Sequence, residues 1–252
     1  MNDLESRLKS EKEFHDSKYT GGDLYPAHYS ARPTVPIYHE MLRDLGPLEA
    51  KTVLEYGCGD GWCTVDLCRG GADVRSFDIS DEAVRSTKAT LARQGLSEHA
   101  EIQVMSAEKL SYDDESFDVA FGFAILHHLD LQLAIPELYR VLKKGGTGIF
   151  AEPLQGNPIL RLYRHLTPQF RTADEEPMEI ASFQKIFSEF SAVQHKEYYL
   201  SGQAALAMLH IPGLRRIYPW TQKAFWSLDE TLLSAIPALG NWAWYSKIIV
   251  TK

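Results

Sequence analysis

The sequence has few cysteines, no long apolar run and no excess of basic residues, and each absence excludes a class of protein. Its three cysteines, Cys58, Cys63 and Cys68, fit neither a disulfide framework nor the C-x-x-C spacing of a zinc site. No stretch approaches the roughly 18 apolar residues of a membrane-spanning helix. Residues 1–16 lack the apolar segment of a signal peptide. We therefore expect a cytoplasmic protein with reduced thiols, no transmembrane segment and no metal site.

The charge balance argues against a nucleic-acid-binding protein. With 34 acidic and 26 basic residues among 252, the chain has a formal net charge of −8. Because basic side chains supply most of the affinity for phosphates, no nucleic-acid partner is expected. The hydrophobic share of 44% is that of a globular protein. Tryptophan is unevenly placed, since Trp226, Trp242 and Trp244 lie near the end of the chain.

Short apolar segments alternate with helix-like segments between residues 51 and 152. The expected strands cover residues 51–56, 73–78, 101–105, 117–123 and 147–152. Alternation with short connections predicts a doubly wound, mostly parallel α/β sheet. Ligands of such sheets bind beyond the carboxyl ends of the strands, where the strand order reverses.

Several local signals set the predicted helix boundaries. Ser80 is expected to cap a helix that Gly95 closes. Apolar residues at helical spacing over residues 131–142 lead to Lys143–Gly146, which we interpret as a basic last turn with a glycine cap. Asn157 before a proline predicts another helix start.

The alternation stops after residue 152. Residues 182–190 are predicted to form a short helix, and residues 192–200 and 244–251 two further strands. The segment 201–243 between these strands is too long for a hairpin. Its apolar, proline-punctuated sequence predicts a helical insertion or lid.

The strongest local motif is the run from Glu55 to Gly61, EYGCGDG, between a predicted strand and a predicted helix. Glycines let the backbone turn sharply and approach a ligand closely. The third glycine comes one residue early for a dinucleotide fingerprint, and Trp62 fills that fingerprint's last glycine position. Asp78 ends the next strand, where a carboxylate accepts both hydroxyls of a ribose or simply caps a turn.

Four motifs in register resemble the class I S-adenosylmethionine-dependent methyltransferases. The nearest group is the small-molecule branch with a leucine–histidine–histidine segment after strand four. The motifs are the glycine loop, FDIS (77–80), SAEKL followed by SFDVAFGFAILHHL (106–129), and YRVLKKGG (139–146). The resemblance implies a Rossmann-like, seven-stranded sheet with S-adenosyl-L-methionine as cofactor. It divides one compact domain into a helical N-terminal cap (1–49), a cofactor-binding core (50–153) and an acceptor-side region (154–252).

The resemblance also assigns residues to the cofactor. Glu55 would fix the methionine end, Asp78 the ribose, and Ile79 would pack on the adenine. Many relatives carry an aspartate where this chain has Ser106, so the adenine amino contact falls to Glu108 or to the backbone. Tyr25 and His28 are further candidates to close the site. The full set of implied contacts is Tyr19, Tyr29, Glu55, Gly57, Cys58, Gly59, Asp78, Ile79, Ala107, Glu108, Gly122 and Phe123.

Three residues near the expected methyl group are candidates for catalysis. His127 and His128 follow strand four, and Glu152 ends strand five. Either histidine acts as a general base or steers the acceptor, or both brace the loop. Glu152 either orients the acceptor or bonds the next loop.

The acceptor side is expected to lie after residue 153. The aromatic segment 201–243 is our preferred acceptor pocket, with a dimer contact or a membrane-surface face as alternatives. Trp244 is placed in the core because it opens the last strand. Arg161, Arg164 and Arg171 either meet an anionic acceptor or form a solvated helix face.

The resulting hypothesis is a monomeric or homodimeric enzyme that methylates an oxygen of a small molecule with an apolar or aromatic body. Two alternatives stay open. The cofactor assists a rearrangement or decarboxylation that adds no methyl mass, or the chain is a non-catalytic binding protein on a methyltransferase fold.

Overall fold

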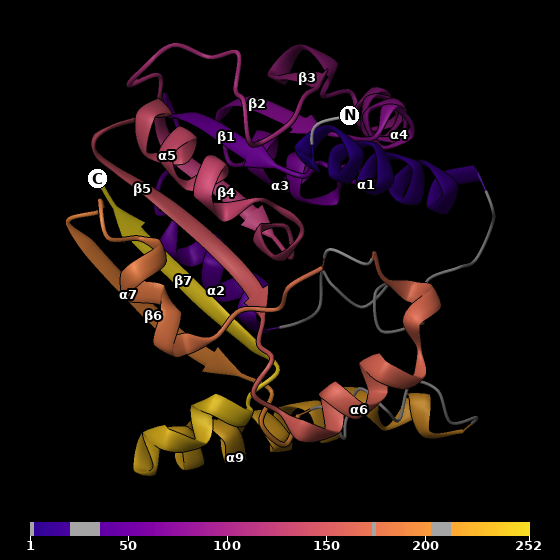
Figure 1. Ribbon diagram of the computed structural model, residues 1–252, viewed down its shortest axis with the longest axis vertical. Coiled ribbons are helices and arrows are strands. Elements are labelled where there is room, and N and C mark those ends of the chain that lie inside the picture. The colour runs from indigo at the N-terminus through magenta and orange to yellow at the C-terminus, as the bar shows by residue number, and fades with distance from the viewer. Residues whose placement is uncertain (1–2, 21–35, 173–174, 203–212) are drawn as a thin grey trace.

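The computed structural model of the chain describes residues 3–20, 36–172, 175–202 and 213–252 (Figure 1). Its strands form a seven-stranded sheet in the order β3-β2-β1-β4-β5-β7-β6. The strands are β1 (Thr52–Tyr56), β2 (Asp73–Asp78), β3 (Ala100–Val104), β4 (Phe117–Phe123), β5 (Leu142–Pro153), β6 (Ala192–Tyr198) and β7 (Tyr245–Thr251). β1 to β5 are parallel, and β7 runs antiparallel to both β5 and β6. The predicted doubly wound, mostly parallel fold is confirmed.

Helices connect and cover these strands. The α-helices are α1 (Asp3–Thr20), α2 (Pro36–Asp44), α3 (Trp62–Arg69), α4 (Asp81–Gln94), α5 (Leu131–Val141), α6 (Pro158–Leu166), α7 (Phe183–Ile186) and α9 (Tyr218–Ala235). The short 3₁₀ helices are η2 (Ser97–His99), η3 (Leu126–His128), η4 (Pro168–Phe170), η5 (Ile180–Ser182), η7 (Leu214–Arg216) and η8 (Pro237–Trp242). None of the described helices combines the length and apolar character needed to cross a membrane.

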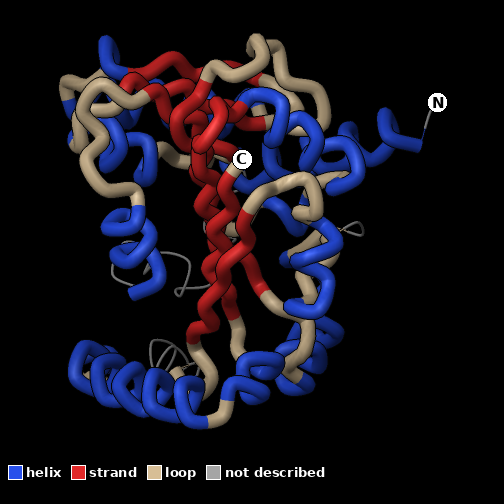
Figure 2. Tube along the Cα trace, turned by 90° about the vertical axis from the view of Figure 1, so that its left-hand side faces the viewer, coloured by secondary structure: helices blue, strands red, loops and turns tan. Residues whose placement is uncertain are grey.

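The sheet forms a central layer with helices on both sides (Figure 2). One face is covered by α2, α3 and α4, whose buried side chains join Val53, Val119 and Ile149 in one apolar cluster. The other face is covered by α5 and α7, whose side chains join Leu54 and Phe150 in a second cluster. Because side chains alternate along a strand, a sheet buried on both faces needs apolar residues at consecutive positions.

Three of the predicted helix boundaries are confirmed. Ser80 caps α4 through its hydroxyl, which accepts the backbone N–H of Ala83. Gly95 ends α4 in the left-handed conformation, with φ of 70°. Asn157 caps α6 by accepting the N–H groups of Ile159 and Leu160.

The interpretation of Lys143–Gly146 as a helix end is wrong. α5 ends at Val141, and these four residues belong to β5. The register between β4 and β5 shifts here, because Phe117 pairs with Leu142 and Val119 with Thr147. The strand therefore bulges, and Gly145 takes the positive φ of 75° that the bulge requires.

The strand order reverses between β1 and β4, which lie side by side although β2 and β3 come between them in the chain. At such a reversal the connections leave on opposite faces of the sheet and open a crevice at its carboxyl edge. The loops after β1 and β4 flank this crevice. They hold the glycine motif and the two adjacent histidines.

Candidate functional site

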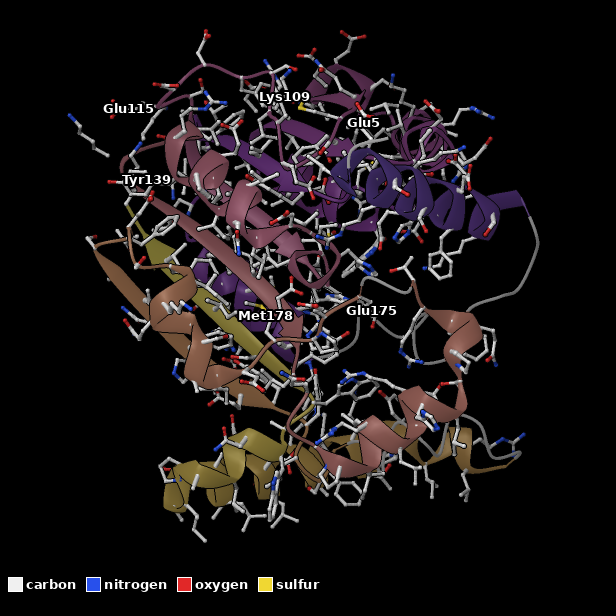
Figure 3. All side chains as sticks on the ribbon, in the orientation of Figure 1. Glu5, Lys109, Glu115, Tyr139, Glu175 and Met178 are labelled. Atoms are coloured by element: carbon white, nitrogen blue, oxygen red, sulfur yellow. The ribbon has the colours of Figure 1, made fainter. Side chains whose placement is uncertain are left out.

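A pocket opens at the carboxyl edge of β1, β2 and β4. Its walls come from α1, the glycine loop, the ends of β2 and β4, the loop after β4, α6 with the segment after it, and the residues at the start of β7. The lining residues are His15, Lys18, Tyr19, Gly57, Gly59, Asp78, Phe123, Ala124, Ile125, His127, His128, Pro153, Leu160, Tyr163, Arg164, Phe170, Arg171, Glu175, Trp244 and Tyr245. Glu175, labelled in Figure 3, belongs to a segment held beside the loop after β4, because the Glu176 N–H donates to the carbonyl of His127 at 2.8 Å.

The glycine loop forms the floor of the pocket. Gly57 and Gly59 have φ angles of 72° and 56°, in the left-handed region that favours glycine. The Gly57 N–H donates to the carbonyl of Phe77 at 2.9 Å, which ties the loop to β2. A Cβ at Gly61 would lie 3.1 Å from the Cα of Thr87, so this glycine lets α4 pack closely against the loop. The loop thus exposes bare backbone to the pocket.

Substituting Gly57 with alanine should destabilise the protein and weaken ligand binding. Left-handed φ costs an alanine about 1–2 kcal/mol, and its Cβ would lie 3.0 Å from the end of the Ile125 side chain in the pocket wall. Gly95→Ala is a matched control, because Gly95 has φ of 70° and a Cβ added there would have nothing within 4 Å. Urea unfolding should show a loss of stability for both variants, whereas calorimetry should show weaker S-adenosylhomocysteine binding for Gly57→Ala alone. Equal affinities would contradict the placement of the loop in the site.

Asp78 closes one end of the pocket at the carboxyl end of β2. Its Oδ2 accepts the N–H of Gly59 at 3.1 Å, and its Oδ1 accepts the N–H of Ser80 at 3.0 Å. An ionised carboxylate accepts about four hydrogen bonds. Asp78 therefore keeps capacity for two more donors on the pocket side, which fits the vicinal hydroxyls of a ribose.

Glu55 lies beneath the loop and is fully buried. Thr64 and Ser76 donate hydroxyl hydrogen bonds to its Oε2 at 2.6 and 2.7 Å. Its Oε1 finds no hydrogen-bond partner among the residues that the structure describes. Burial raises the pKa of Glu55 to about 7, although the hydrogen bonds from the two hydroxyls lower it. One buried acceptor is thus left for an additional donor.

The raised pKa of Glu55 makes stability depend on pH in the ligand-free protein. A carboxyl whose pKa is raised in the folded state makes its full contribution to the free energy of unfolding below its unfolded pKa of 4.5. This contribution is lost as pH rises through about 7, the pKa of Glu55 in the folded state. The loss amounts to up to about 3 kcal/mol. Glu55→Gln should remove it, whereas Glu49→Gln, at an exposed site, should not. Urea unfolding at pH 5 and pH 8 checks this, and parallel pH profiles for wild type and Glu55→Gln would contradict it.

A second buried carboxylate, Glu152, organises the loop after β4. Its Oε1 accepts the N–H groups of Ile125 and Leu126 at 3.0 and 2.9 Å. Its Oε2 lies 2.7 Å from Nδ1 of His127. Burial raises the pKa of Glu152 to about 8 although the backbone donors lower it, and burial lowers the pKa of His127. The two groups therefore titrate as a pair. Loss of one proton from the pair leaves the remaining proton between Oε2 and Nδ1, and Nε2 of His127 is then a free base.

His128 points to a different neighbour. Its Nδ1 lies 3.3 Å from Oε2 of Glu11, and its ring packs edge-on against that of His15. Burial opposes ionisation of Glu11, but the contacts from His128 and His15 hold the pKa of that carboxyl well below its usual range. The helix α1 is thereby joined to the loop after β4.

Residues 54–150 match the protein family described as "Methyltransferase domain". The chain carries a class I S-adenosylmethionine-dependent methyltransferase domain. The matched segment runs from β1 to β5, and so includes the glycine loop, Asp78 and the loop that Glu152 organises.

Individual relatives agree with this family. The chain is 31% identical to the ubiquinone biosynthesis O-methyltransferase of Nitrosomonas europaea over 121 residues, which are 47% of this chain and 50% of that protein. It spans only 31% to 50% of the length of other curated relatives that it matches.

Two solved methyltransferases share the fold. Phosphoethanolamine N-methyltransferase 2 of Haemonchus contortus superposes with a TM-score of 0.65 at 16% identity, over 85% of this chain and 52% of that one. Geranyl diphosphate C-methyltransferase of Streptomyces coelicolor A3(2) gives a TM-score of 0.65 at 10% identity, over 97% of each chain. The three relatives named here are an O-, an N- and a C-methyltransferase.

The pocket contains part of the predicted residue set. Seven predicted residues line it: Tyr19, Gly57, Gly59, Asp78, Phe123, His127 and His128. Seven others are not among the lining residues: Glu55, Cys58, Ile79, Ala107, Glu108, Gly122 and Glu152. Both oxygens of Glu108 are already engaged, by the hydroxyl of Ser106 and the N–H of Asp130. Tyr25, His28 and Tyr29 lie outside the described residues.

The aromatic wall of the pocket differs from the sequence expectation. None of the described residues of segment 201–243 lines the pocket. Instead, Tyr163 of α6, Phe170, Trp244 and Tyr245 supply its aromatic wall. Trp244 packs on the core, as predicted, but also faces the pocket. α9 lies beyond the ends of β6 and β7 (Figure 1), and its Trp220 is 77% exposed.

Proposed function

We propose that this protein transfers the methyl group of S-adenosylmethionine to a small molecule. One observation carries the proposal: the glycine loop, Asp78 and His127 line a single pocket, and Glu152 holds His127 through its Nδ1. Asp78 would hold the ribose hydroxyls, the loop would pass beneath the cofactor, and the buried Glu55 would favour its cationic methionine end. The cofactor supplies an activated sulfonium methyl, so the protein needs to align an acceptor and exclude water. Positioning of this kind contributes up to about 7–11 kcal/mol.

The wall opposite the loop supports an acceptor with an apolar or aromatic body. Phe123 stacks on Tyr245 with ring centroids 5.9 Å apart, and Tyr163, Phe170 and Trp244 extend this surface. Aromatic faces bind flat apolar ligands well. Arg164 and Arg171 also line the pocket, where a guanidinium favours a partly anionic acceptor.

Oxygen is the proposed acceptor atom, because the pocket holds a base suited to a hydroxyl. A phenol or alcohol keeps its proton at neutral pH and reacts faster when a base removes that proton. His127 lines the pocket, and Glu152 holds its Nδ1, so the other ring nitrogen is the one available to a hydroxyl. His127 is the proposed catalytic residue and Glu152 its positioning residue.

Product analysis tests the proposal. The purified protein is incubated with S-adenosylmethionine and a panel of phenols, hydroxy acids and amines, and both products are followed by mass spectrometry. We expect S-adenosylhomocysteine together with an acceptor about 14 Da heavier. An acceptor that changes structure without gaining mass would establish the rearrangement instead. Cofactor binding without turnover of any acceptor in the panel would count against catalysis.

A further inference from the structure

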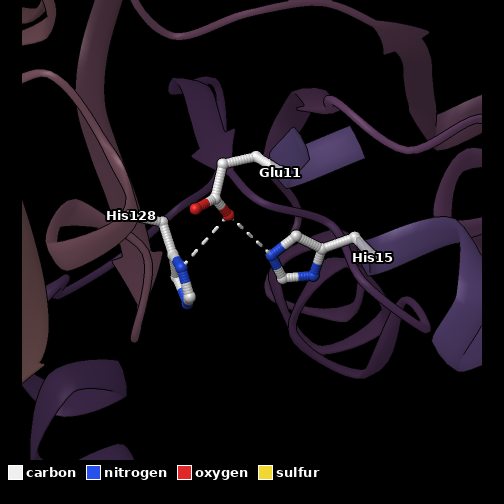
Figure 4. A group of neighbouring side chains, drawn as sticks. All are labelled: Glu11, His15 and His128. Atoms are coloured by element: carbon white, nitrogen blue, oxygen red, sulfur yellow. Dashed lines mark ion pairs between the residues drawn. The ribbon is translucent and has the colours of Figure 1, made fainter. Parts of the chain in front are cut away.

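Three side chains meet where α1 crosses the loop after β4. Oε2 of Glu11 lies 3.4 Å from Nε2 of His15 and 3.3 Å from Nδ1 of His128, so two rings face one carboxylate oxygen (Figure 4). One ligand atom from each residue lies within 4.8 Å of the other two. Glu11 and His15 reach the same point because residues four apart share a face of an α-helix.

The carboxylate in this group is buried without a strong partner. Glu11 is 4% exposed, and neither of its oxygens has a hydrogen-bond partner of good geometry among the described residues. Nδ1 of His128 lacks one as well. Buried carboxylates are normally paired with a cation or bound to a metal ion. The spacing fits the second case, because zinc bonds of about 2.0–2.1 Å place tetrahedral ligands about 3.4 Å apart.

We propose that Glu11, His15 and His128 form a binding site for one divalent transition-metal ion of the Zn²⁺ type. Two imidazoles and one carboxylate favour such ions over Mg²⁺ and Ca²⁺, which prefer oxygen ligands only. His15 and His128 also line the methyltransferase pocket, whereas Glu11 lies behind them. An ion held by these three residues would therefore lie at the wall of this pocket. This inference goes beyond methyl transfer and does not depend on it.

A neighbouring group of three is the weaker candidate. His127, His128 and Glu175 also bring ligand atoms within 4.8 Å of one another. However, His127 is bonded to Glu152 through Nδ1, and Glu175 has a cation partner in Arg171, whose Nε lies 3.6 Å from its Oε1. Among the described residues, the ion-pair partners of Glu11 are histidines alone. Glu11 thus has no lysine or arginine partner among these residues, whereas Glu175 has one.

Metal titration tests the site without any enzymatic readout. The chelator-treated protein is titrated with Zn²⁺ by calorimetry and with Co²⁺ by visible absorption, whose d–d bands report tetrahedral coordination. We expect saturable binding of one ion per chain at micromolar concentration or below. Glu11→Gln, His15→Gln and His128→Gln should each weaken binding by about tenfold or more. Zn²⁺ should also raise the unfolding temperature of the wild type, and this rise should be smaller in each of the three variants.

Two control variants separate this site from adventitious binding. His99 and His39 are exposed and remote from the group, so His99→Gln and His39→Gln should bind Zn²⁺ like the wild type. Glu175→Gln should change the affinity by less than threefold, because Arg171 already compensates that charge. Circular dichroism confirms that each variant is folded. Absence of saturable binding, binding that survives Glu11→Gln, or binding lost in an exposed-histidine control would each overturn the proposal.

Discussion

Substituting Asp78 with alanine should weaken S-adenosylhomocysteine binding by about 10²–10⁴-fold. The carboxylate would accept two ribose hydroxyls, and each hydrogen bond to a charged group contributes about 1.5–3 kcal/mol. The change also removes the acceptor for the N–H groups of Gly59 and Ser80, which loosens the glycine loop. Calorimetric titration of the purified variant measures the effect.

Asp73 provides the matched control for this substitution. It opens the same strand, β2, at the opposite edge of the sheet, and its side chain is 56% exposed. Asp73→Ala should bind S-adenosylhomocysteine like the wild type. If Asp78→Ala kept an affinity within threefold of the wild type while remaining folded, the ribose would have to bind elsewhere.

Substituting His127 with asparagine should lower kcat by about 10²–10⁴-fold and leave the affinity for S-adenosylhomocysteine nearly unchanged. A positioned general base contributes this much to proton transfer, and asparagine keeps a polar side chain beside Glu152. Glu152→Gln should also lower kcat, because glutamine favours the wrong ring tautomer of His127. Stopped-time methyl-transfer assays at saturating cofactor measure both variants.

The pH profile separates a base from a merely structural histidine. In the wild type the free base forms when the His127–Glu152 pair loses its proton, so kcat should rise as pH rises through about 8, the raised pKa of Glu152. Glu152→Gln should shift this rise to lower pH, since the histidine then titrates alone. A wild-type profile that is flat between pH 6 and pH 9, or full activity of His127→Asn, would show that no base operates here.

The core of the fold was predictable because the local sequence patterns, such as apolar runs and helix caps, agree with the tertiary packing. Phe117–Phe123 is apolar except at Asp118, and a strand buried on both faces requires a nearly continuous apolar run. Ser80 and Gly95 fix α4 through their own backbone chemistry. Lys143–Gly146 was mispredicted because lysines and glycines suit a helix end locally, whereas pairing of Leu142 with Phe117 starts β5 one residue after α5.

The cofactor side of the site was easier to predict than the acceptor side. Gly57, Gly59 and Asp78 lie within short motifs whose spacing is set by one strand–loop–helix unit. The aromatic wall instead joins Tyr163 of α6 and Trp244, which are 81 positions apart in the chain and come together only at the pocket. No local pattern encodes that meeting.

The Glu11–His15–His128 group could not be predicted for a related reason. The cysteine spacing indicates no metal site, and His128 lies far from Glu11 and His15 in the sequence. The local signal in the sequence is Glu11, four residues before His15 in α1. This spacing is common in helices and indicates a metal site only once the structure shows that Glu11 is buried.

A crystal structure with S-adenosylhomocysteine is the most direct test of the proposed site. We expect the ribose hydroxyls within hydrogen-bond distance of Asp78, the methionine moiety over Gly57 and Gly59, and the sulfur directed toward the wall formed by Phe123, His127 and Tyr245. A ligand bound away from Asp78 and the glycine loop, or no ligand at millimolar concentration, would contradict the assignment of this pocket to methyl transfer.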